Sequence, residues 1–232
     1  MISVAMATYN GEKYIRRQIE SILVNLSPAD EIIVSDDGST DNTIAYIQSF
    51  NDDRIKIVRG PGKGIVSNFA CAIANCSGDI IFLSDQDDYW YPNKVERVLK
   101  AFDANNCVLI EHNGRVVDDD QNVVFSDFFE HRRVRTGFFR NMMRNTYHGC
   151  LIAFKSSLKD TLEPYPAKGC FHDQWIGLMA EKHGGCFFLN EILMDYYRHP
   201  GNASSFVHHP FKKQLEDRLA LFIHIIKRTF HK

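Results

Sequence analysis

The sequence predicts an α/β fold with a mostly parallel sheet and helices on both of its faces. Within the first hundred residues, short apolar segments alternate four times with longer segments whose apolar residues recur at helical spacing. This alternation is typical of a parallel sheet, because each helix returns the chain to the edge where the next strand begins. A chain of 232 residues with 44% hydrophobic residues can form one sizeable domain, and its composition excludes a low-complexity or wholly disordered protein.

Four pairs of a strand and a helix are expected before residue 104. The strands are short and mostly apolar, at 2–7, 32–34, 55–58 and 80–83. The apolar stripes of the four helices are Ile15, Ile19 and Ile22, then Ile44 and Ile47, then Val66, Phe69 and Ile73, and last Val95, Val98 and Phe102. Each stripe gives its helix one side that can pack on the sheet.

After residue 104 the alternation is less regular. We expect strands at 108–112, 123–125 and 146–154 and a helix at 172–182. Residues 128–145 are rich in arginine and aromatic residues without a clear period, which is typical of a partly ordered surface loop. The sequence contains no internal repeat and no linker, so we expect one domain that ends near residue 207.

The last residues, 208–232, differ from the rest of the chain in charge. They hold six Lys or Arg against two acidic residues, whereas the whole chain has a formal net charge of −2. Their apolar residues at helical spacing are Leu215, Leu219, Phe222, Ile226 and Phe230. We expect a basic amphipathic helix that packs on the body of the protein, forms a homodimer or lies on an anionic membrane. The acidic balance of the whole chain argues against nucleic acid as a partner.

The cysteines and the N-terminus indicate the compartment. The six cysteines include no Cys-x-x-Cys pair, which is typical of free thiols in a reducing environment. Residues 1–7 lack the basic start of a signal peptide, and no run approaches the ~18 apolar residues of a membrane span. We therefore expect a cytoplasmic protein, with peripheral contact to the inner face of the plasma membrane if the tail binds lipid.

Polar clusters follow three of the four predicted parallel strands. Residues 9–11 follow the first strand, 35–39 the second and 84–88 the fourth. In open α/β sheets, ligands bind beyond the carboxyl ends of the strands. The three clusters therefore predict a binding site at this edge of the sheet.

Carboxylates dominate these clusters. They are Asp36, Asp37, Asp85, Asp87 and Asp88. Without a cation they would repel each other and raise one another's pKa. Aspartate oxygens suit Mg²⁺ or Mn²⁺, and Mg²⁺ is typically held by carboxylates together with substrate phosphates, so the clusters predict a metal and a phosphorylated substrate. The alternative is that these residues only end strands and cap helices.

Three runs carry a specific resemblance. Met6-Ala-Thr-Tyr-Asn-Gly, Ser35-Asp-Asp-Gly-Ser-Thr-Asp and Phe82-Leu-Ser-Asp-Gln-Asp-Asp-Tyr-Trp resemble the motifs of the inverting family-2 glycosyltransferases of GT-A fold. The chain looks closest to the rhamnosyltransferase-like members, which build bacterial O-antigens, capsules and related glycans. His172-Asp-Gln-Trp lies where such enzymes carry their acceptor-side catalytic aspartate.

The resemblance covers residues 2 to about 205 and implies a domain organisation. Residues 1–207 would form a Rossmann-like GT-A domain, with a nucleotide-sugar-binding half at 1–104 and a small acceptor-side half at 105–207. The C-terminal helix at 208–232 would follow it.

The resemblance also implies residue roles on the donor side. Thr8, Tyr9 and Asp37 match contacts to the base and ribose of the nucleotide sugar. Asn68 matches a recurrent Gly…Asn pair, although a role in helix packing is an equal alternative. The residues assigned to the nucleotide sugar are Thr8, Tyr9, Asn10, Asp37, Asn68, Asp85, Gln86 and Arg198.

The metal ligands and the base follow in the same way. Asp87 closes the family's Asp-x-Asp motif, which implies a direct metal ligand, and Asp173 matches the general base. The family often has an Arg-x-His-x-x-Asn segment near the metal and diphosphate. His199 keeps that spacing, but Tyr197 stands at the arginine position and Arg198 is displaced by one residue. His199 is therefore a metal ligand or a loop histidine, and Arg198 can meet a phosphate.

The implied function is that of a metal-dependent inverting glycosyltransferase. The donor would be dTDP-rhamnose or a UDP-hexose, and the acceptor a hydroxyl of a growing, lipid-linked bacterial glycan. A single in-line displacement needs one base and no protein nucleophile, so the product should have inverted anomeric configuration. The alternatives are a nucleotidyltransferase and a catalytically inactive nucleotide-sugar-binding module. Residues 128–145 are then a surface loop or a contact to a lipid-linked diphosphate acceptor.

Overall fold

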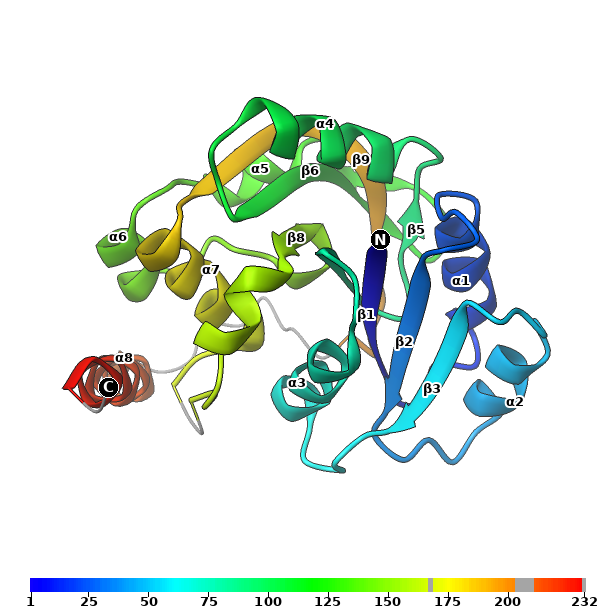
Figure 1. The fold of residues 1–232 in the computed structure, drawn as a ribbon, viewed down its shortest axis with the longest axis horizontal. Helices are drawn as coiled ribbons and strands as arrows, with labels where there is room; N and C mark the ends of the chain where they lie inside the picture. Colours follow the sequence, from blue (N-terminus) through cyan, green and yellow to red (C-terminus); the bar gives the residue numbers. More distant parts are fainter. Residues whose placement is uncertain (167–168, 203–210, 231–232) are drawn as a thin grey trace.

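The computed structural model describes residues 1–166, 169–202 and 211–230. Its N-terminal half contains the predicted parallel strands: β1 (Ile2–Thr8), β2 (Glu31–Asp36), β3 (Ile55–Arg59) and β4 (Ile80–Ser84). They lie in the order β3-β2-β1-β4, and all three neighbouring pairs are parallel (Figure 1). The parallel arrangement predicted from the alternation is confirmed for these strands.

The second half of the chain extends the same sheet with mixed strand directions. The additional strands are β5 (Tyr89–Trp90), β6 (Leu109–Asp118), β7 (Val123–Phe125), β8 (Ile152–Lys155) and β9 (Cys186–Arg198). The sheet continues from β4 through β8, β6 and β9 to β5, with β7 paired to β6. β6 and β9 are parallel, whereas β8 pairs with β4 and β6 in antiparallel direction.

Helices cover both faces of the sheet. They are α1 (Ile15–Leu23), α2 (Thr43–Gln48), α3 (Ile65–Asn75), α4 (Lys94–Ala104), α5 (Phe128–Arg132), α6 (Phe138–Met143), α7 (His172–His183) and α8 (Phe211–Phe230), with 3₁₀ turns at Gly149–Leu151 and Ser156–Thr161. The helices α1, α2 and α4 contribute to one apolar core, and α3, α7 and α8 to the other.

Strand β1 shows how the sequence produces the two cores. Successive side chains of a strand point to opposite faces. Val4 and Met6 pack in the core that contains Ile19 of α1, and Ala5 between them packs in the core that contains Phe69 of α3. All these side chains are fully buried, and burying one residue as large as Ile19 stabilises the fold by about 1.5–3 kcal/mol.

The predicted strand at 146–154 is wrong in its first part. Residues 149–151 form a 3₁₀ turn, and the strand begins only at Ile152. At Gly149 an added Cβ atom would lie 2.7 Å from Nε2 of His172, so the chain comes too close to α7 for a larger residue. The expectation of a loop at 128–145 is also incomplete. Residues 128–132 and 138–143 are helical, and the carboxylate of Asp127 caps α5 by accepting the N–H of Glu130 at 2.9 Å.

Helix α8 forms as predicted but uses a different apolar stripe to contact the body. Leu221 and Ile225 are buried in the core beside α7, and Nε of Arg218 donates to the carbonyl of Met143 at 2.8 Å. The predicted stripe is exposed to solvent at Leu215, Leu219, Phe222 and Ile226, as is Ile223, whereas the side chain of Phe230 lies outside the described residues. No helix among the described residues is long and apolar enough to cross a membrane. All six cysteines are free thiols, as predicted.

Candidate active site

The carboxyl ends of β1, β2 and β4 border a cavity of about 640 Å³. Thr8 pairs with Asp36 and Met6 with Ser84 in the registers of these strands, so the loops that follow them start at one edge of the sheet. The predicted site residues that line the cavity are Thr8, Tyr9, Asp37, Asn68, Asp85, Gln86, Asp87, Asp173 and Arg198. The structure thus brings these residues together around one cavity at the predicted edge, and their binding roles stay predictions.

Asn10 lies beside the cavity and connects two of its loops. Its side-chain oxygen accepts the N–H of Thr40 at 2.8 Å, and its own N–H donates to Oγ of Ser39 at 2.8 Å. These bonds hold the loop after β1 against the loop after β2. The predicted contact of Asn10 with the nucleotide sugar stays a prediction.

Gln86 holds the backbone of Tyr9. Its Oε1 accepts the N–H of Tyr9 at 2.9 Å, and its Nε2 donates to the Tyr9 carbonyl at 3.1 Å. The Tyr9 side chain is 57% exposed at the opening of the cavity. A Cβ atom on Gly11 would lie only 2.3 Å from Oε1 of Gln86, which explains the glycine of the Tyr-Asn-Gly run. Gln86 thus positions the loop on which Tyr9 is presented.

The two aspartates after β2 bind different parts of the backbone. Asp36 is buried, and its carboxylate accepts the N–H groups of Gly38 and Ser39 and the hydroxyl of Thr8. Asp37 accepts the N–H groups of Gly62 at 2.7 Å and Gly64 at 2.8 Å. Asp36 therefore caps its own turn, and Asp37 orders the glycine-containing loop at the border of the cavity.

Asn68 supplies an unused hydrogen-bond acceptor. Its Nδ2 donates to the carbonyl of Thr8 at 3.1 Å, while its Oδ1 is buried and has no partner among the described residues. This oxygen is covered by the protein and lies on the side of Gly60, which does not line the cavity. Asn68 thus joins α3 to β1, and its predicted contact with the nucleotide sugar stays a prediction.

Asp87 and His199 come together although 112 residues separate them. Nε2 of His199 lies 2.8 Å from Oδ2 of Asp87, and the amide of Asn202 donates to the same oxygen at 3.1 Å. The His199 ring stacks on Tyr14, with 4.3 Å between ring centroids. Asp87 is only 7% exposed, because these neighbours cover it. A carboxylate beside an imidazole is a ligand pair suited to Mn²⁺.

Asp85 reaches the same cavity without a protein partner. Among the described residues, no group donates a hydrogen bond to its carboxylate. Burial, together with the charge of Asp87, raises the pKa of Asp85 to about 8. A cation near both carboxylates would favour their ionised forms. Among the described residues, however, the ligand atoms that gather within 4.8 Å of one another belong to Asp85, Asp88 and Cys150. A metal held by Asp87 and His199 therefore stays a prediction.

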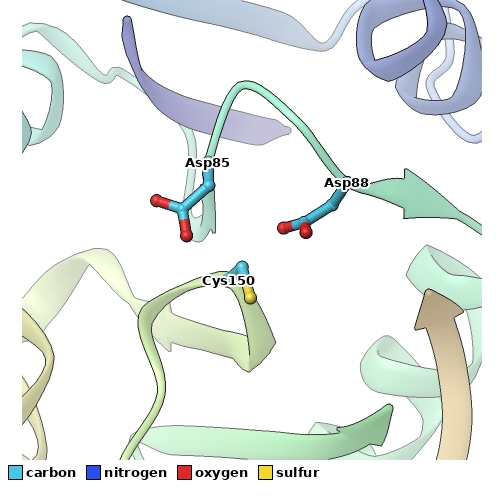
Figure 2. A group of neighbouring side chains, drawn as sticks. All are labelled: Asp85, Asp88 and Cys150. Atoms are coloured by element: carbon cyan, nitrogen blue, oxygen red, sulfur yellow. The ribbon is translucent and has the colours of Figure 1, made fainter. Parts of the chain in front are cut away.

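A second group of potential ligands lies deeper. Figure 2 shows Asp85, Asp88 and Cys150 as neighbouring side chains, and their ligand atoms lie within 4.8 Å of one another. Asp88 and Cys150 are fully buried, and Oδ1 of Asp88 accepts the N–H of Tyr197 at 3.1 Å. Burial raises the pKa of the Cys150 thiol, so it stays protonated and suits Mg²⁺ or Mn²⁺ poorly. Asp88 instead joins the loop after β4 to β9.

Lys94 lies against this buried group. Its Nζ donates to the carbonyl of Cys150 at 3.2 Å and sits 3.7 Å from the ring centroid of Trp90. Burial lowers the pKa of Lys94 to about 7, and the carboxylates of Asp88 and Asp85 oppose that shift. Lys94 is therefore only partly protonated near neutral pH, and its contacts join α4 to the turn at Cys150.

Asp173 stands across the cavity in the first turn of α7. Its Oδ1 accepts the N–H of Gln174 at 2.6 Å and the side-chain amide of Asn145 at 3.2 Å. Burial raises the pKa of Asp173 to about 6, although these hydrogen bonds partly oppose the shift. A carboxylate with this pKa is ionised near neutral pH and can still accept a proton, as a general base requires.

Arg198 and several residues not predicted from the sequence complete the wall. Nη1 of Arg198 donates to the hydroxyl of Tyr196 at 3.0 Å. The lining residues that the sequence did not single out as site residues include Arg132, Asn145, Tyr147, His148, Phe171 and His172. His172 lies next to Asp173 in the recognised motif, which was the one available signal for its position. The others follow no strand end, so their spacing carries no such signal.

Comparison with known protein families shows to which family the chain belongs. The model of the family described as "Glycosyl transferase family 2" matches residues 3–160, more than half of the chain. The chain belongs to glycosyl transferase family 2. The matched region contains the donor-side residues up to Asp87, whereas Asp173, Arg198 and His199 lie beyond it.

The chain is similar to several named glycosyltransferases of bacteria. The chain is 25% identical over 217 residues to UDP-Glc:alpha-D-GlcNAc-diphosphoundecaprenol beta-1,3-glucosyltransferase WfgD of Escherichia coli, covering 92% of this chain and 83% of WfgD. It is 34% identical over 141 residues to dTDP-rhamnosyl transferase RfbG of Shigella flexneri, covering 53% and 49%. It is 31% identical over 126 residues to an uncharacterised glycosyltransferase of Nostoc sp., of which it covers only 39%. The chain thus spans about half or less of the length of some relatives.

Solved structures of similar fold include proteins with bound nucleotide sugars. Residues 1–349 of S. aureus TarS, solved with UDP-GlcNAc, match 95% of this chain and 65% of that one, with a TM-score of 0.74 and 18% identity. Mannosyltransferase PcManGT from Pyrobaculum calidifontis, solved with GDP-Man and Mn²⁺, matches 84% of this chain and 56% of that one, with a TM-score of 0.63 and 18% identity. These likenesses confirm the GT-A fold expected of this family-2 chain.

Proposed function

We propose that this chain is a metal-dependent inverting glycosyltransferase that moves a sugar from a nucleotide diphosphate sugar to a hydroxyl of a bacterial glycan. One observation carries the proposal. Asp85 and Asp87 at the end of β4 and Asp173 at the start of α7 line a single cavity. A one-step displacement requires carboxylates on the donor side and a base whose pKa lies close to neutral pH.

The residues of the cavity have distinct roles in this proposal. Thr8, Tyr9 and Asp37 contact the base and ribose, and Arg198 meets the diphosphate. Asp87 and His199 would hold Mg²⁺ or Mn²⁺, with Asp85 beside them on the nucleotide-sugar side. The metal would supply a Lewis acid that stabilises negative charge on the nucleoside diphosphate. Asp173 accepts the proton of the acceptor hydroxyl while that oxygen attacks the anomeric carbon. Asn145 positions the carboxylate through its hydrogen bond to Oδ1.

The substrate class follows from the relatives and from the sequence motifs. The name of WfgD states UDP-Glc as donor and a diphosphoundecaprenol-linked acceptor, and that of RfbG states a dTDP-rhamnosyl donor. For this chain we propose dTDP-rhamnose or a UDP-hexose as donor and a lipid-linked glycan as acceptor. A single displacement with Asp173 as base gives a product of inverted anomeric configuration.

A ligand panel tests the donor and the metal together. The thermal unfolding midpoint of the purified protein is measured with UDP-, dTDP- and GDP-sugars, with and without Mn²⁺. A ligand at ~100 times its Kd adds about 2.7 kcal/mol to stability, which for a domain of this size corresponds to a rise of roughly 5–10 °C. We expect that rise with a dTDP- or UDP-sugar in the presence of Mn²⁺.

The stabilising donor is then supplied with a glycan acceptor, and the product is measured. Equal stabilisation with and without Mn²⁺ would contradict the metal-dependent part of the proposal. Donor binding without any transfer, over a panel of acceptors, would favour the inactive binding module.

We also propose that α8 brings the enzyme to an anionic membrane, where a lipid-linked acceptor resides. Its exposed apolar residues include Leu219, at 57% exposure, and Phe222, at 44%. The exposed lysines Lys212, Lys213 and Lys227 lie on the same helix. Basic residues near an anionic surface contribute about 1 kcal/mol each, and apolar side chains that insert between lipids add to this. The alternative is that the exposed stripe forms a homodimer.

Substitution at the exposed stripe distinguishes these alternatives. Leu219→Gln with Phe222→Gln leaves the buried contacts of Leu221 and Ile225 intact, so the fold should persist. We expect weaker co-sedimentation with phosphatidylglycerol vesicles and slower transfer to lipid-linked acceptors, while transfer to a short water-soluble acceptor is largely kept.

The control is Val24→Gln with Val123→Gln, which removes two exposed apolar side chains elsewhere. It should leave vesicle binding unchanged. If the α8 variant binds vesicles like wild type but sediments as a smaller species, the stripe is a dimer interface and the membrane proposal fails.

A further inference from the structure

A second cavity, of about 560 Å³, lies beside α6 and outside the proposed catalytic machinery. Its charged lining consists of Arg133, Arg135, Arg140 and Arg144. All four residues are exposed. The segment 128–145 that contributes them holds five arginines and a single glutamate. The cavity therefore concentrates positive charge on an otherwise acidic chain.

The four guanidinium groups lack anionic partners in the folded protein. Among the described residues, none of them forms an ion pair or a side-chain hydrogen bond. By contrast, the exposed Arg16 pairs with Glu20, and the partly buried Arg97 pairs with Glu191. Like charges gathered in one cavity repel each other unless an anion binds between them. The guanidinium fork matches the oxygens of a phosphate group.

Apolar side chains border the same cavity. Phe139 is 74% exposed and Met143 is 53% exposed, and both contribute to its lining. Large apolar residues at such exposure next to four cationic groups suit a ligand that carries a phosphate group beside a hydrocarbon chain. An inorganic phosphate would leave both side chains uncovered.

The basic cavity shares a wall with the active site. Arg132 and Asn145 line the catalytic cavity, and their neighbours Arg133 and Arg144 line the basic one. Consecutive Cα atoms are about 3.8 Å apart, so one layer of chain separates the two cavities at this point. Asn145 also donates to the carboxylate of Asp173. A group attached to an acceptor sugar at Asp173 would thus lie within reach of the basic cavity.

We propose that the Arg133–Arg135–Arg140–Arg144 cavity binds the diphosphate that joins the acceptor sugar to its lipid, with Phe139 and Met143 contacting the start of the hydrocarbon chain. The proposal rests on the glycosyltransferase function proposed above. A phosphate ester on a hydrocarbon chain could also come from the headgroup of a membrane phospholipid, and the experiment distinguishes the two sources.

The first arm measures binding to the full chain in metal-free buffer containing EDTA, so that a metal-supported donor site does not take up the probe. The probe is farnesyl diphosphate, a soluble prenyl diphosphate, and farnesol serves as the same chain without phosphate. We expect farnesyl diphosphate to bind wild type and to bind Arg140→Gln with Arg144→Gln at least about tenfold more weakly. Farnesol should bind wild type much more weakly than farnesyl diphosphate does.

The matched control removes two positive charges elsewhere. Lys100→Gln with Lys182→Gln changes the net charge by the same amount on α4 and at the end of α7, and it should leave the affinity for farnesyl diphosphate unchanged. Vesicles of phosphatidylglycerol form the second probe. If the arginine variant binds these vesicles more weakly than wild type but keeps its affinity for farnesyl diphosphate, the assignment to the acceptor diphosphate is overturned. Equal affinity of wild type and the arginine variant for farnesyl diphosphate would also overturn it.

The second arm measures transfer to two acceptors that carry the same sugar. One bears it on farnesyl diphosphate and the other as an alkyl glycoside without phosphate. We expect the arginine variant to raise KM about tenfold for the diphosphate acceptor only, with kcat retained. An equal rise for both acceptors would contradict a diphosphate site. If wild type transfers sugar to neither acceptor, the proposed function fails, and the binding arm still decides the role of the cavity.

Discussion

Asp173→Asn is expected to lower the transfer rate by about 100-fold or more while the affinity for the nucleotide sugar stays near that of wild type. The substitution keeps the size of the side chain and its hydrogen-bonding position beside Asn145 and removes its ability to accept a proton. The donor contacts proposed for the end of β1 and for Asp37 do not involve this carboxylate. Single-turnover rates and donor Kd values for both proteins measure the effect.

Two further readouts separate a base from a structural residue. Asp103→Asn, an exposed aspartate on α4, should behave as wild type. Because the pKa of Asp173 is raised to about 6, its basic form predominates above pH 6, so the wild-type rate should fall about tenfold per pH unit below that value. A large loss of donor affinity in Asp173→Asn would place the residue on the nucleotide side instead.

Asp87→Asn is expected to abolish metal-supported donor binding and turnover. The neutral amide has lost the charge that attracts the cation, and the proposed ligand pair with His199 is reduced to the imidazole. Asp87 is only 7% exposed and is hydrogen-bonded to His199 and Asn202. Its substitution can therefore also change the stability of the fold. The thermal midpoint of the variant must therefore be measured beside its donor affinity, with and without Mn²⁺.

The control for Asp87→Asn is again Asp103→Asn, and His199→Gln provides a second variant of the same pair. We expect His199→Gln to weaken the Mn²⁺ dependence of donor binding without abolishing it, because Asp87 and Asp85 remain. If Asp87→Asn is fully active and still requires metal, other residues must bind the metal.

The first half of the fold could be predicted because its information is local. In β1 a mostly apolar run indicates burial on both faces, and in α1 the spacing of Ile15, Ile19 and Ile22 indicates one packing side. Parallel order then places the ends of β1, β2 and β4 at one edge. The edge of the sheet that borders the cavity follows from these facts, whereas the donor-side residue roles come from the family resemblance.

The acceptor side depends on contacts between distant residues and could be predicted less well. β8 inserts between β4 and β6, and its hydrogen bonds determine where the strand starts, which the apolar run at 146–154 does not. Asn145 enters the site because its amide meets Asp173, 28 residues away. Arg132 and Arg133 line different cavities although they are adjacent. No periodicity in the sequence predicts which cavity each of them lines.

Helix α8 shows a different limit. Its sequence contains two apolar stripes, and periodicity alone does not determine which one meets the body. The structure places Leu221 and Ile225 beside Trp175 and His224, and leaves the Leu215–Leu219–Phe222 stripe exposed. The choice depends on the surface that α7 offers.

The central claim is that the donor and its metal are held by the Asp85–Asp87 side of one cavity while Asp173 acts only on the acceptor. Calorimetric Kd values for one nucleotide sugar with Mn²⁺, measured on wild type, Asp173→Asn and Asp87→Asn, test it most directly. We predict that Asp173→Asn binds the donor as wild type does and that Asp87→Asn loses the Mn²⁺-dependent binding. Loss of binding in Asp173→Asn together with wild-type binding in Asp87→Asn would contradict the account.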